Sequence, residues 1–489
     1  MEQREETIVI FPFMAQGHII PALALALQVE QMGYKITLVN TPLNIRNLKS
    51  SLPPASTINL LELPFNSSDH CGLLPESENT DVLPYPLIVN LLHASLSLRP
   101  TFHNLLSGLV RGGAPPLCII ADIFLGWTVE VAHELGLFHA FFSGAGGFGL
   151  ACYTSMWLHL PHRKTDSVEF TLPDFQESGK FHITQLSATV LTADGTDPWS
   201  KFQHGNIPFW GESDGFLFNT VEELDKTGLN YFRRKFGVSV WPVGPILTSA
   251  GHTVSTGQET KFSLERYVEW LDEKPAKSVI YVSFGTQNTI SASQMTQLAK
   301  ALEGCEQYFI WVVRPPLGFD INAEFQAEEW LPEGFIQRNE ESKRGLVVVK
   351  WAPQVEILSH GSVGVFLSHC GWNSVLESLS RGVPLIGWPM AAEQFYNVKF
   401  LEEEVRVCLE VARGTVFEVR CADIEEKIRL VMGEGDRGKE IRRRACEVKD
   451  MIKDAIRVKE GFKGSSVKAM EDFLNAALLV KEKTRVAGL

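Results

Sequence analysis

The residues with the clearest chemical potential lie in two groups, one in each half of the chain. In the second half, the segment HCGWNS at 369–374 follows an apolar run that ends at Ser368 and precedes a helical pattern. A turn of this kind presents free backbone N–H groups and the positive end of a helix dipole to an anion, most naturally a phosphate. Asn373 or Ser374 is expected to cap the helix. A plain connecting turn is the structural alternative, but Trp372 beside the polar turn favours a site that the indole covers.

The first half offers a pair of groups suited to acid–base chemistry. His18 follows a strand expected at 7–13, and Asp122 follows a strand expected at 117–121. Because the carboxyl ends of parallel strands share one edge of a sheet, both side chains are expected at that edge. A carboxylate that holds one imidazole nitrogen fixes the tautomer and raises the basicity of the ring. A structural histidine at a turn and an aspartate that caps a strand end are the alternatives.

Both groups depend on strands that bring them to a sheet edge. Short β-branched and aromatic runs alternate with helix-length segments along the chain, which is typical of parallel strands covered by helices on both faces. We therefore predict an α/β, doubly wound fold. The expected strands lie at 7–13, 35–39, 57–61, 117–121, 138–143, 216–220, 278–284, 307–313, 345–350, 363–368 and 383–388.

A change of composition divides the chain into two halves. Its 489 residues predict two or three domains, at roughly 100–200 residues each. Residues 245–262 are rich in Gly, Ser and Thr without apolar periodicity, which indicates a linker. We expect an N-terminal domain at 1–244 and a second domain at 263–464. The last segment, 465–489, carries an apolar helical stripe that must pack on one of them.

Composition and charge exclude several classes of protein. Lys and Arg total 45 against 58 for Asp and Glu, and the resulting net charge of −13 argues against a nucleic-acid surface. The 8 cysteines are dispersed without a CxxC pair, which is typical of a reducing compartment. No signal-peptide pattern opens the sequence, and apolar runs of about ten residues are too short to span a bilayer. We expect a cytoplasmic monomer with no nucleic-acid partner and no stable membrane insertion.

Three further motifs match known patterns only in part. The Gly144–Gly149 run spells GxGxxG after a strand, but the acidic strand end that a dinucleotide site needs about 20 residues later is absent. The Gly433–Lys439 run lacks the Ser or Thr of a P-loop, and His133-Glu134 lacks the second histidine of a zinc helix. No Asp-x-Asp occurs either, so we expect no metal site. A nicotinamide-dependent oxidoreductase, which depends on Gly144–Gly149 alone, is the weakest alternative.

The stretch from Trp351 to Gln394 resembles the signature box of plant secondary-product UDP-glycosyltransferases, at both ends and through its HCGWNS core. The segments MAQGHIIP, ADIFLGW, FNTVEELD, WPVGP and YVSFGT look like further landmarks of that family, in the family's order. The resemblance implies a GT-B fold, in which two Rossmann-like doubly wound domains face each other across a cleft. It also implies that the C-terminal domain holds most of the donor and that the helix at 465–489 packs back on the N-terminal domain.

The resemblance assigns roles to individual residues. The residues it implies are Trp351, Ala352, Gln354 and Glu377 for the uridine; Thr286, His369, Asn373 and Ser374 for the diphosphate; and Trp372, Glu393 and Gln394 for the sugar. His18 would be the general base for the acceptor hydroxyl, with Asp122 to orient it and to stabilise the imidazolium. Gln394 beside Glu393 is the family's usual sign of a preference for UDP-glucose.

The implied function is inverting transfer of glucose from UDP-glucose to a hydroxyl of a small lipophilic acceptor, such as a phenolic, a flavonoid or a terpenoid. Helix N–H groups and His369 would stabilise the leaving diphosphate, so neither a metal nor a further cofactor is expected. A nucleotide-sugar-binding protein with little turnover is an alternative, but it would not need both His18 and Asp122. Transfer of another sugar, or transfer to a carbon or nitrogen atom, stays open.

The acceptor site is the part that the sequence determines least. The segments 62–98 and 163–210, which vary widely in proteins of this kind, are expected to form much of it. Aromatic residues that follow the strands are candidates to line it, and these are Phe13, Phe124, Phe142 and Phe148.

Overall fold

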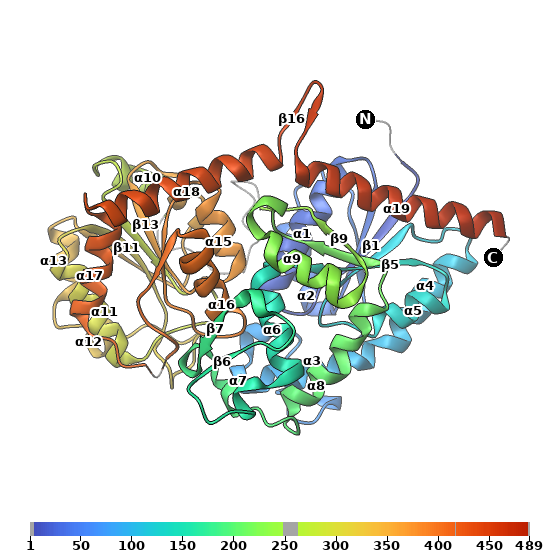
Figure 1. Ribbon diagram of the computed structural model, residues 1–489, viewed down its shortest axis with the longest axis horizontal. Helices are drawn as coiled ribbons and strands as arrows, with labels where there is room; N and C mark the ends of the chain where they lie inside the picture. Colours follow the sequence, from blue (N-terminus) through green and yellow to red (C-terminus); the bar gives the residue numbers. More distant parts are fainter. Residues whose placement is uncertain (1–3, 248–262, 416, 488–489) are drawn as a thin grey trace. The chain divides into compact units, whose positions relative to one another are not determined.

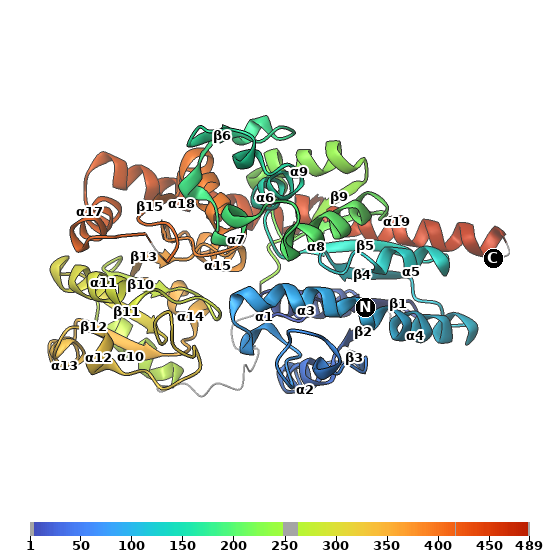
Figure 2. The same cartoon turned by 90° about the horizontal axis from the view of Figure 1, so that it is seen from below.

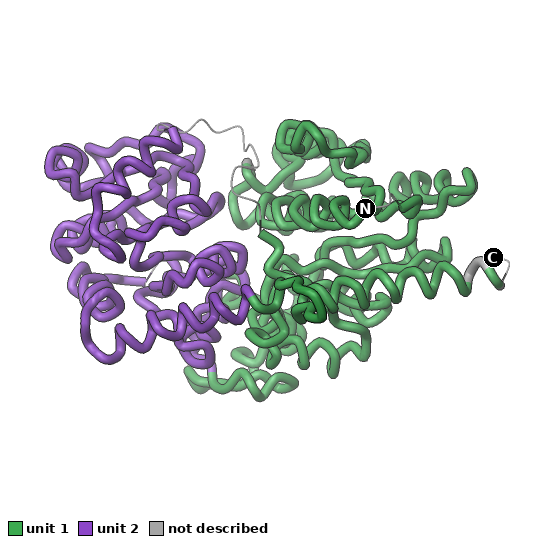
Figure 3. The backbone as a smooth tube through the Cα atoms, turned by 90° about the horizontal axis from the view of Figure 1, so that it is seen from above, with its two compact units in different colours: residues 1–180, 189–256, 454–489 green, residues 181–188, 257–453 purple. Residues whose placement is uncertain are grey.

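The computed structural model describes residues 4–247, 263–415 and 417–487, and the chain forms two compact units. Unit 1 comprises residues 1–180, 189–256 and 454–489, and unit 2 comprises residues 181–188 and 257–453 (Figure 3). This division differs from the expected domains in two places. The segment 181–188 groups with unit 2, and the chain rejoins unit 1 at 454 rather than at 465. Most of the expected linker, residues 248–262, lies outside the described residues.

Unit 1 is built on a seven-stranded sheet in which every strand pairs in parallel, in the order β3-β2-β1-β4-β5-β8-β9 (Figure 2). Its strands are β1 (Thr7–Phe11), β2 (Lys35–Asn40), β3 (Asn59–Glu62), β4 (Cys118–Asp122), β5 (Phe138–Ser143), β8 (Gly215–Phe218) and β9 (Ser239–Pro242). Six of the seven confirm the expected strands, and β9 at the sheet edge was not expected. Two short strands outside this sheet, β6 (Glu169–Thr171) and β7 (Lys180–His182), form a separate pair.

The order of this sheet reverses direction between β1 and its neighbour β4. These two strands pair in register, with Phe11 opposite Ala121. The connection after β1 leads to one side of the pair and the connection after β4 leads to the other, so a crevice opens at their carboxyl ends. His18 follows β1, and Asp122 is the last residue of β4. The topology of the sheet therefore brings the expected acid–base pair to its switch point.

Helices cover both faces of this sheet, as the continuous apolar strands require. The helices in this part of the chain are α1 (Gln16–Gln31), α2 (Pro42–Ser51), α3 (Ile88–Ala94), α4 (Arg99–Arg111), α5 (Thr128–Glu134), α6 (Gly147–His159), α7 (Ala188–Thr192), α8 (Pro198–Asn206), α9 (Glu222–Phe236) and α19 (Ser465–Ala487). The last helix, α19, lies along β9 and β5 (Figure 1). Its residues Met470, Phe473 and Leu474 belong to the same core cluster as Phe138 and Trp241.

Unit 2 contains a six-stranded sheet, also parallel throughout, in the order β12-β11-β10-β13-β14-β15. Its strands are β10 (Val279–Ser283), β11 (Tyr308–Val313), β12 (Gly345–Val349), β13 (Val363–Ser368), β14 (Leu385–Gly387) and β15 (Cys408–Glu410). The first five confirm the expected strands, whereas β15 was not expected. Here the order reverses between β10 and β13, where Ser283 lies opposite Ser368. The expected diphosphate residues follow these two strands.

The helices of unit 2 pack against this sheet and against one another. They are α10 (Leu264–Asp272), α11 (Ala292–Gly304), α12 (Ala327–Trp330), α13 (Phe335–Glu341), α14 (Gln354–Ser359), α15 (Trp372–Leu379), α16 (Gln394–Lys399), a π-helix (Phe400–Val405), α17 (Cys421–Met432) and α18 (Asp436–Ala455). Helix α11 packs on α17, and α14 packs on α15 (Figure 2). A hairpin of β16 (Val458–Lys459) and β17 (Phe462–Lys463) separates α18 from α19 (Figure 1).

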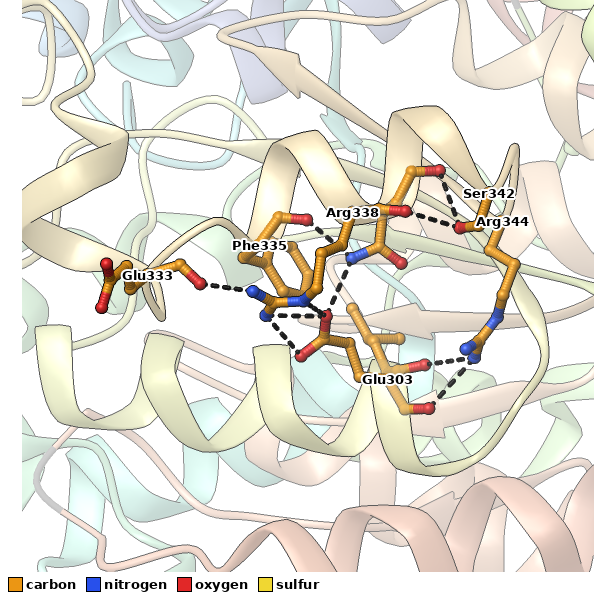
Figure 4. Close-up of polar contacts among 8 residues, drawn as sticks. Glu303, Glu333, Phe335, Arg338, Ser342 and Arg344 are labelled. Atoms are coloured by element: carbon orange, nitrogen blue, oxygen red, sulfur yellow. Dashed lines mark hydrogen bonds and ion pairs between the residues drawn. The ribbon is translucent and has the colours of Figure 1, made fainter.

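A polar network fastens α11 to the segment that leads into β12 (Figure 4). The Arg338 guanidinium donates from Nε to Glu303 Oε1 at 3.1 Å, while Arg344 donates to the backbone carbonyl of Glu303 at 3.0 Å. Glu303 lies in the last turn of α11, where carbonyl groups lack helical partners and attract a cation. The network therefore fixes the start of β12, the strand that leads to Trp351.

Candidate active site

His18 and Asp122 are in direct contact in unit 1. His18 Nδ1 lies 2.7 Å from Asp122 Oδ2, and the second carboxylate oxygen accepts a hydrogen bond from the Phe124 backbone N–H at 3.0 Å. The Asp122 side chain is 4% exposed and that of His18 is 26% exposed. A buried carboxylate of this kind holds the imidazole by one nitrogen and directs the opposite nitrogen, Nε2, away from it. The contact that the sequence left open is thus present, and the catalytic role of the pair stays a prediction.

Two aromatic rings flank His18. The centroids of Phe124 and Phe13 lie 5.3 Å and 5.8 Å from that of the imidazole. The other two aromatic candidates for an acceptor pocket lie elsewhere: Phe142 belongs to the core cluster of unit 1, and Phe148 packs against Phe175. Of the four candidates, Phe13 and Phe124 are therefore those next to the acid–base pair.

The glycine-rich run at Gly144–Gly149 packs two helices together. The buried Asp225 carboxylate accepts hydrogen bonds from the backbone N–H groups of Gly147 at 2.5 Å and of Phe148 at 2.8 Å, at the start of α6. A Cβ atom at Gly228 of α9 would lie only 2.0 Å from the Phe148 nitrogen. A side-chain carboxylate thus already occupies the N–H groups that a dinucleotide phosphate would use, which removes the basis for the oxidoreductase alternative.

The HCGWNS segment forms a tight turn between β13 and α15 in unit 2. Cys370 adopts a left-handed conformation with φ of 60°, and its N–H donates to Ser368 Oγ at 3.0 Å. Helix α15 begins at Trp372 with Gly371 as its N-cap, and no side chain caps it. The expectation that Asn373 or Ser374 caps the helix is therefore wrong, because the left-handed turn at Cys370 starts the helix earlier. Both residues lie instead in its first turn.

His369 lies beside this turn with its imidazole between two glycines. A Cβ atom at Gly285 would lie 3.0 Å from His369 Nε2, and one at Gly371 would lie 2.6 Å from it, so both positions need glycine to leave room for the ring. Burial lowers the pKa of His369 to about 4, which leaves the imidazole neutral at pH 7. A neutral imidazole can donate one N–H bond to a phosphate oxygen.

Three residues expected at the uridine and diphosphate form one hydrogen-bond network. Gln354 Nε2 donates to Glu377 Oε2 at 2.7 Å and to Ser374 Oγ at 3.0 Å. Burial raises the pKa of Glu377, while the Gln354 hydrogen bond and the Arg381 charge act in the opposite direction. A carboxylate held in this network is suited to accept hydrogen bonds from paired hydroxyl groups such as those of a ribose.

Trp351 and Thr286 lie at the same carboxyl edge of the second sheet. Trp351 follows β12 and donates its N–H to the Val349 carbonyl at 3.0 Å, directly after Lys350, whose φ is 71°. Ala352, next in the chain, is buried. Thr286 follows β10 and Gly285, on the strand next to β13. The structure thus places the expected uridine and diphosphate residues after three strands of one sheet.

The residues expected at the sugar lie around α16 and α15. Gln394 Oε1 accepts hydrogen bonds from the backbone N–H groups of Met390 and Ala391, both at 3.0 Å, and Glu393 precedes the helix. Trp372 is 3% exposed, and its ring lies 6.3 Å from that of Phe400. The donor-site roles of these residues stay predictions.

Two residues with contacts through α16, Asn397 and Phe181, were not predicted from the sequence. Asn397 Nδ2 donates to the Cys370 carbonyl at 2.9 Å and so joins α16 to the HCGWNS turn. Phe181, far away in the sequence, packs against Tyr396 of the same helix. Asn397 was not predicted because it lies within an apolar run that begins at Phe395. No local sequence pattern indicates the contact that Phe181 makes.

No group of three or more His, Cys, Asp or Glu side chains among the described residues is arranged to hold a metal ion. Over the same residues, no helix combines the length and the apolar character needed to cross a lipid bilayer.

Comparisons with known proteins agree with this geometry. Residues 212–434 match the model of the family described as UDP-glucoronosyl and UDP-glucosyl transferase. The chain is 51% identical to UDP-glycosyltransferase 92A1 of Arabidopsis thaliana, with 98% of each chain covered. It is 45% identical to crocetin glucosyltransferase 3 of Crocus sativus, over 87% of this chain and 90% of the relative.

A solved structure extends the similarity to the whole fold. UGT73P12 of Glycyrrhiza uralensis, complexed with glycyrrhetinic acid 3-O-monoglucuronide, superposes with a TM-score of 0.82 at 28% identity, over 99% of this chain and 98% of that one. The expected GT-B architecture is thereby confirmed. Because identity above 30% extends over almost the full length of a relative, the chain belongs to the plant UDP-glycosyltransferase family and transfers a glycosyl group from a UDP-sugar to a small-molecule acceptor.

Proposed function

We propose that the chain transfers glucose from UDP-glucose to a hydroxyl group of a small lipophilic acceptor, with inversion at the anomeric carbon. The observation that carries the proposal is the 2.7 Å contact between His18 and Asp122 at the switch point of the first sheet. A base held in this way can accept the proton of a hydroxyl group as its oxygen attacks. The pair would be unnecessary in a protein that only binds nucleotide sugars.

In the proposed reaction, the acceptor O–H proton moves to His18 Nε2 while the acceptor oxygen forms a bond to the anomeric carbon. The bond between that carbon and the UDP oxygen breaks, and UDP leaves from the opposite face. Asp122 stabilises the imidazolium that forms, since its carboxylate already holds Nδ1. General-base help of this kind contributes on the order of 10²–10⁴ in rate.

The leaving diphosphate needs stabilisation of its charge. We propose that the first turn of α15 and the neutral imidazole of His369 supply it through N–H donors, with the Thr286 hydroxyl. The mechanism then requires no metal ion and no further cofactor. The Gln394 side chain supports glucose as the sugar, because its carbonyl oxygen is engaged by Met390 and Ala391 and its amide is left as a donor to a sugar hydroxyl.

The acceptor class is proposed from the surroundings of the base. The half-buried ring of Phe124 beside His18, which packs on the buried Phe13, supports an apolar acceptor with a flat face, such as a phenolic, a flavonoid or a terpenoid. Crocetin, a dicarboxylic acid, is a separate candidate because a relative at 45% identity carries that name; its carboxylate would give a glucose ester and would need no general base. Cytoplasmic location and a monomeric state stay predictions, which cell fractionation and light scattering would test.

The experiment is a matrix of donors and acceptors with the product identified by mass and by the anomeric proton coupling. UDP-glucose, UDP-galactose and UDP-glucuronate are each offered with a flavonol, a triterpenoid and crocetin. The proposal predicts a glucoside of β configuration as the main product. A product of retained configuration, or a clear preference for another UDP-sugar, would contradict it.

A further inference from the structure

Eight residues from the first half of the chain belong to unit 2. The chain leaves unit 1 after Lys180 and returns to it at Thr189, so that Phe181–Ala188 groups with unit 2, which carries the residues proposed to bind the donor. This segment lies within 163–210, the region expected to serve the acceptor. The segment therefore lies among the residues expected to bind the donor.

The segment is anchored by Phe181 against α16. The Phe181 side chain is fully buried, and its ring meets that of Tyr396 edge to face, with the centroids 5.8 Å apart. Lys399 Nζ lies 5.1 Å from the centroid of the same ring and pairs with Glu403 at 2.6 Å. Tyr396 and Lys399 are three residues apart and so share one face of the helix, which the phenyl ring covers.

A second contact joins the segment to the loop that follows β15. Arg413 donates from its guanidinium to Thr184 Oγ1. The turn at Thr184 is held from within, because Gln185 Oε1 accepts the His182 N–H at 2.9 Å. The neighbouring Gly414 donates its N–H to the Pro389 carbonyl at 2.7 Å, in the loop that precedes Gln394. Both anchors of the segment therefore adjoin the stretch 388–394.

Helix α16 depends on such contacts for its position. Together with the π-helix Phe400–Val405 that continues it directly, it has twelve residues, still too few to be stable without its surroundings. Asn397 ties it to the HCGWNS turn through the Cys370 carbonyl, and Phe181 covers the neighbouring face. The residues that precede and open this helix are Glu393 and Gln394, the two expected to contact the sugar.

We propose that Phe181–Ala188 is a clasp that positions the sugar-binding end of α16, with Phe181 and Thr184 as positioning residues for Glu393 and Gln394. The inference rests on the proposed function, in which these two residues hold the glucose. The uridine residues Trp351, Gln354 and Glu377 follow other strands, so loss of the clasp should weaken binding of the sugar and leave binding of the nucleotide intact.

The test compares the affinities of UDP and UDP-glucose by titration calorimetry, with KM and kcat for UDP-glucose measured in parallel. For Phe181→Ala we expect the dissociation constant of UDP to stay within about twofold, while that of UDP-glucose and its KM rise by about fivefold or more, since small misplacements at a reacting centre have large effects. Thr184→Val should act in the same direction with a smaller change. Thr184→Ser keeps the hydroxyl and should behave as the wild type.

Ile428→Ala is the matched control, because Ile428 is fully buried in unit 2 on α17 and takes no part in the clasp. It should lower the unfolding temperature and leave the ratio of the two affinities unchanged. Thr184 is exposed, so Thr184→Val carries the test if Phe181→Ala fails to fold. The positioning role would be overturned if the clasp variants kept the wild-type ratio of the UDP and UDP-glucose dissociation constants and the wild-type KM for UDP-glucose. If the wild type bound neither UDP nor UDP-glucose, the proposed function itself would be overturned.

Discussion

Two histidines lie at carboxyl ends of strands, and their surroundings prepare them for different tasks. His18 keeps about a quarter of its side chain exposed and contacts a buried carboxylate at 2.7 Å. His369 is buried between Gly285 and Gly371, and its pKa of about 4 keeps it a neutral donor. The surroundings of His18 suit a proposed base, and those of His369 suit a proposed phosphate ligand.

Asp122→Asn tests the charge of the carboxylate that holds His18. The amide oxygen can still accept the Phe124 N–H bond that Oδ1 accepts now, so the turn is retained. Without the negative charge, the imidazolium loses its stabilisation, and kcat should fall by roughly 10²-fold or more. Steady-state kinetics with saturating acceptor and a thermal unfolding control measure this, and a kcat near that of the wild type would remove Asp122 from the mechanism.

Glu377 should make donor binding depend on pH. Burial raises its pKa, and ribose hydroxyl groups bind the ionised form, so the dissociation constant of UDP-glucose should increase as the pH falls through that raised pKa. Protonation of His369 near pH 4 would act in the opposite sense, by adding a positive charge beside the diphosphate. Calorimetry between pH 8 and pH 5 measures the effect.

Glu377→Gln supplies the comparison for this pH dependence. The variant should bind UDP-glucose more weakly at pH 8 and show little change in affinity as the pH falls. An equally steep pH dependence in the variant would assign the effect to another group.

At the scale of elements, eleven strands of the two large sheets were predictable, whereas the last strand of each sheet, β9 and β15, was not. Runs such as TIVIF and SVIYVS have no polar alternation because helices cover both faces. In contrast, β15 has three residues and β9 ends in Pro242, and such edge strands resemble loops in composition. The helix cap at Gly371 was missed for another reason, since Cys370 takes a left-handed conformation that sequence patterns assign to glycine.

The loop that carries Asp174 joins α6 and α9 through one carboxylate. Burial acts to raise the pKa of Asp174, but hydrogen bonds from Lys235, Ser155 and His159 lower it to about 2. Because the folded-state pKa lies below the unfolded value, this stabilisation is present above about pH 4 and is lost as the pH falls through about 2. Asp174→Asn should therefore lower the free energy of unfolding at pH 7 by about 2 kcal/mol.

Thermal unfolding between pH 7 and pH 2.5 measures this difference. The gap in unfolding temperature between wild type and Asp174→Asn should narrow as the pH falls. Asp166→Asn, at an exposed position in the same part of the chain, is the control and should behave as the wild type. A gap that stays constant with pH would mean that the Asp174 charge does not stabilise the fold.

At the scale of the whole molecule, each compact unit repeats one arrangement, a parallel sheet with residues of the proposed site after the strands of its switch point. The residues at the carboxyl ends of the strands could be foreseen from the sequence, whereas the strand order that makes these positions switch points is known only from the structure. The clasp could not be foreseen, because the contact of Phe181 with Tyr396 joins residues more than two hundred positions apart, and periodicity reports only local neighbours.

The hydrogen-bond donors of unit 2 that are proposed to bind the diphosphate predict that turnover does not depend on a divalent cation. Backbone N–H groups of α15, His369 and Thr286 are the groups proposed to meet the diphosphate charge. Turnover of UDP-glucose should therefore stay within about twofold of its starting value in excess chelator, since such donors stabilise charge without a metal. A loss of activity that Mg²⁺ or Mn²⁺ restores would contradict this part of the mechanism.

The most direct test of the central claim is a comparison of turnover and UDP affinity in His18→Ala. The account predicts that kcat for a hydroxyl acceptor falls by about 10²–10⁴, while the dissociation constant of UDP is unchanged because its proposed ligands all lie in unit 2. His133→Ala, at an exposed histidine of unit 1, should leave both quantities as they are. Turnover like that of the wild type in His18→Ala would show that another group removes the proton and would contradict the proposed mechanism.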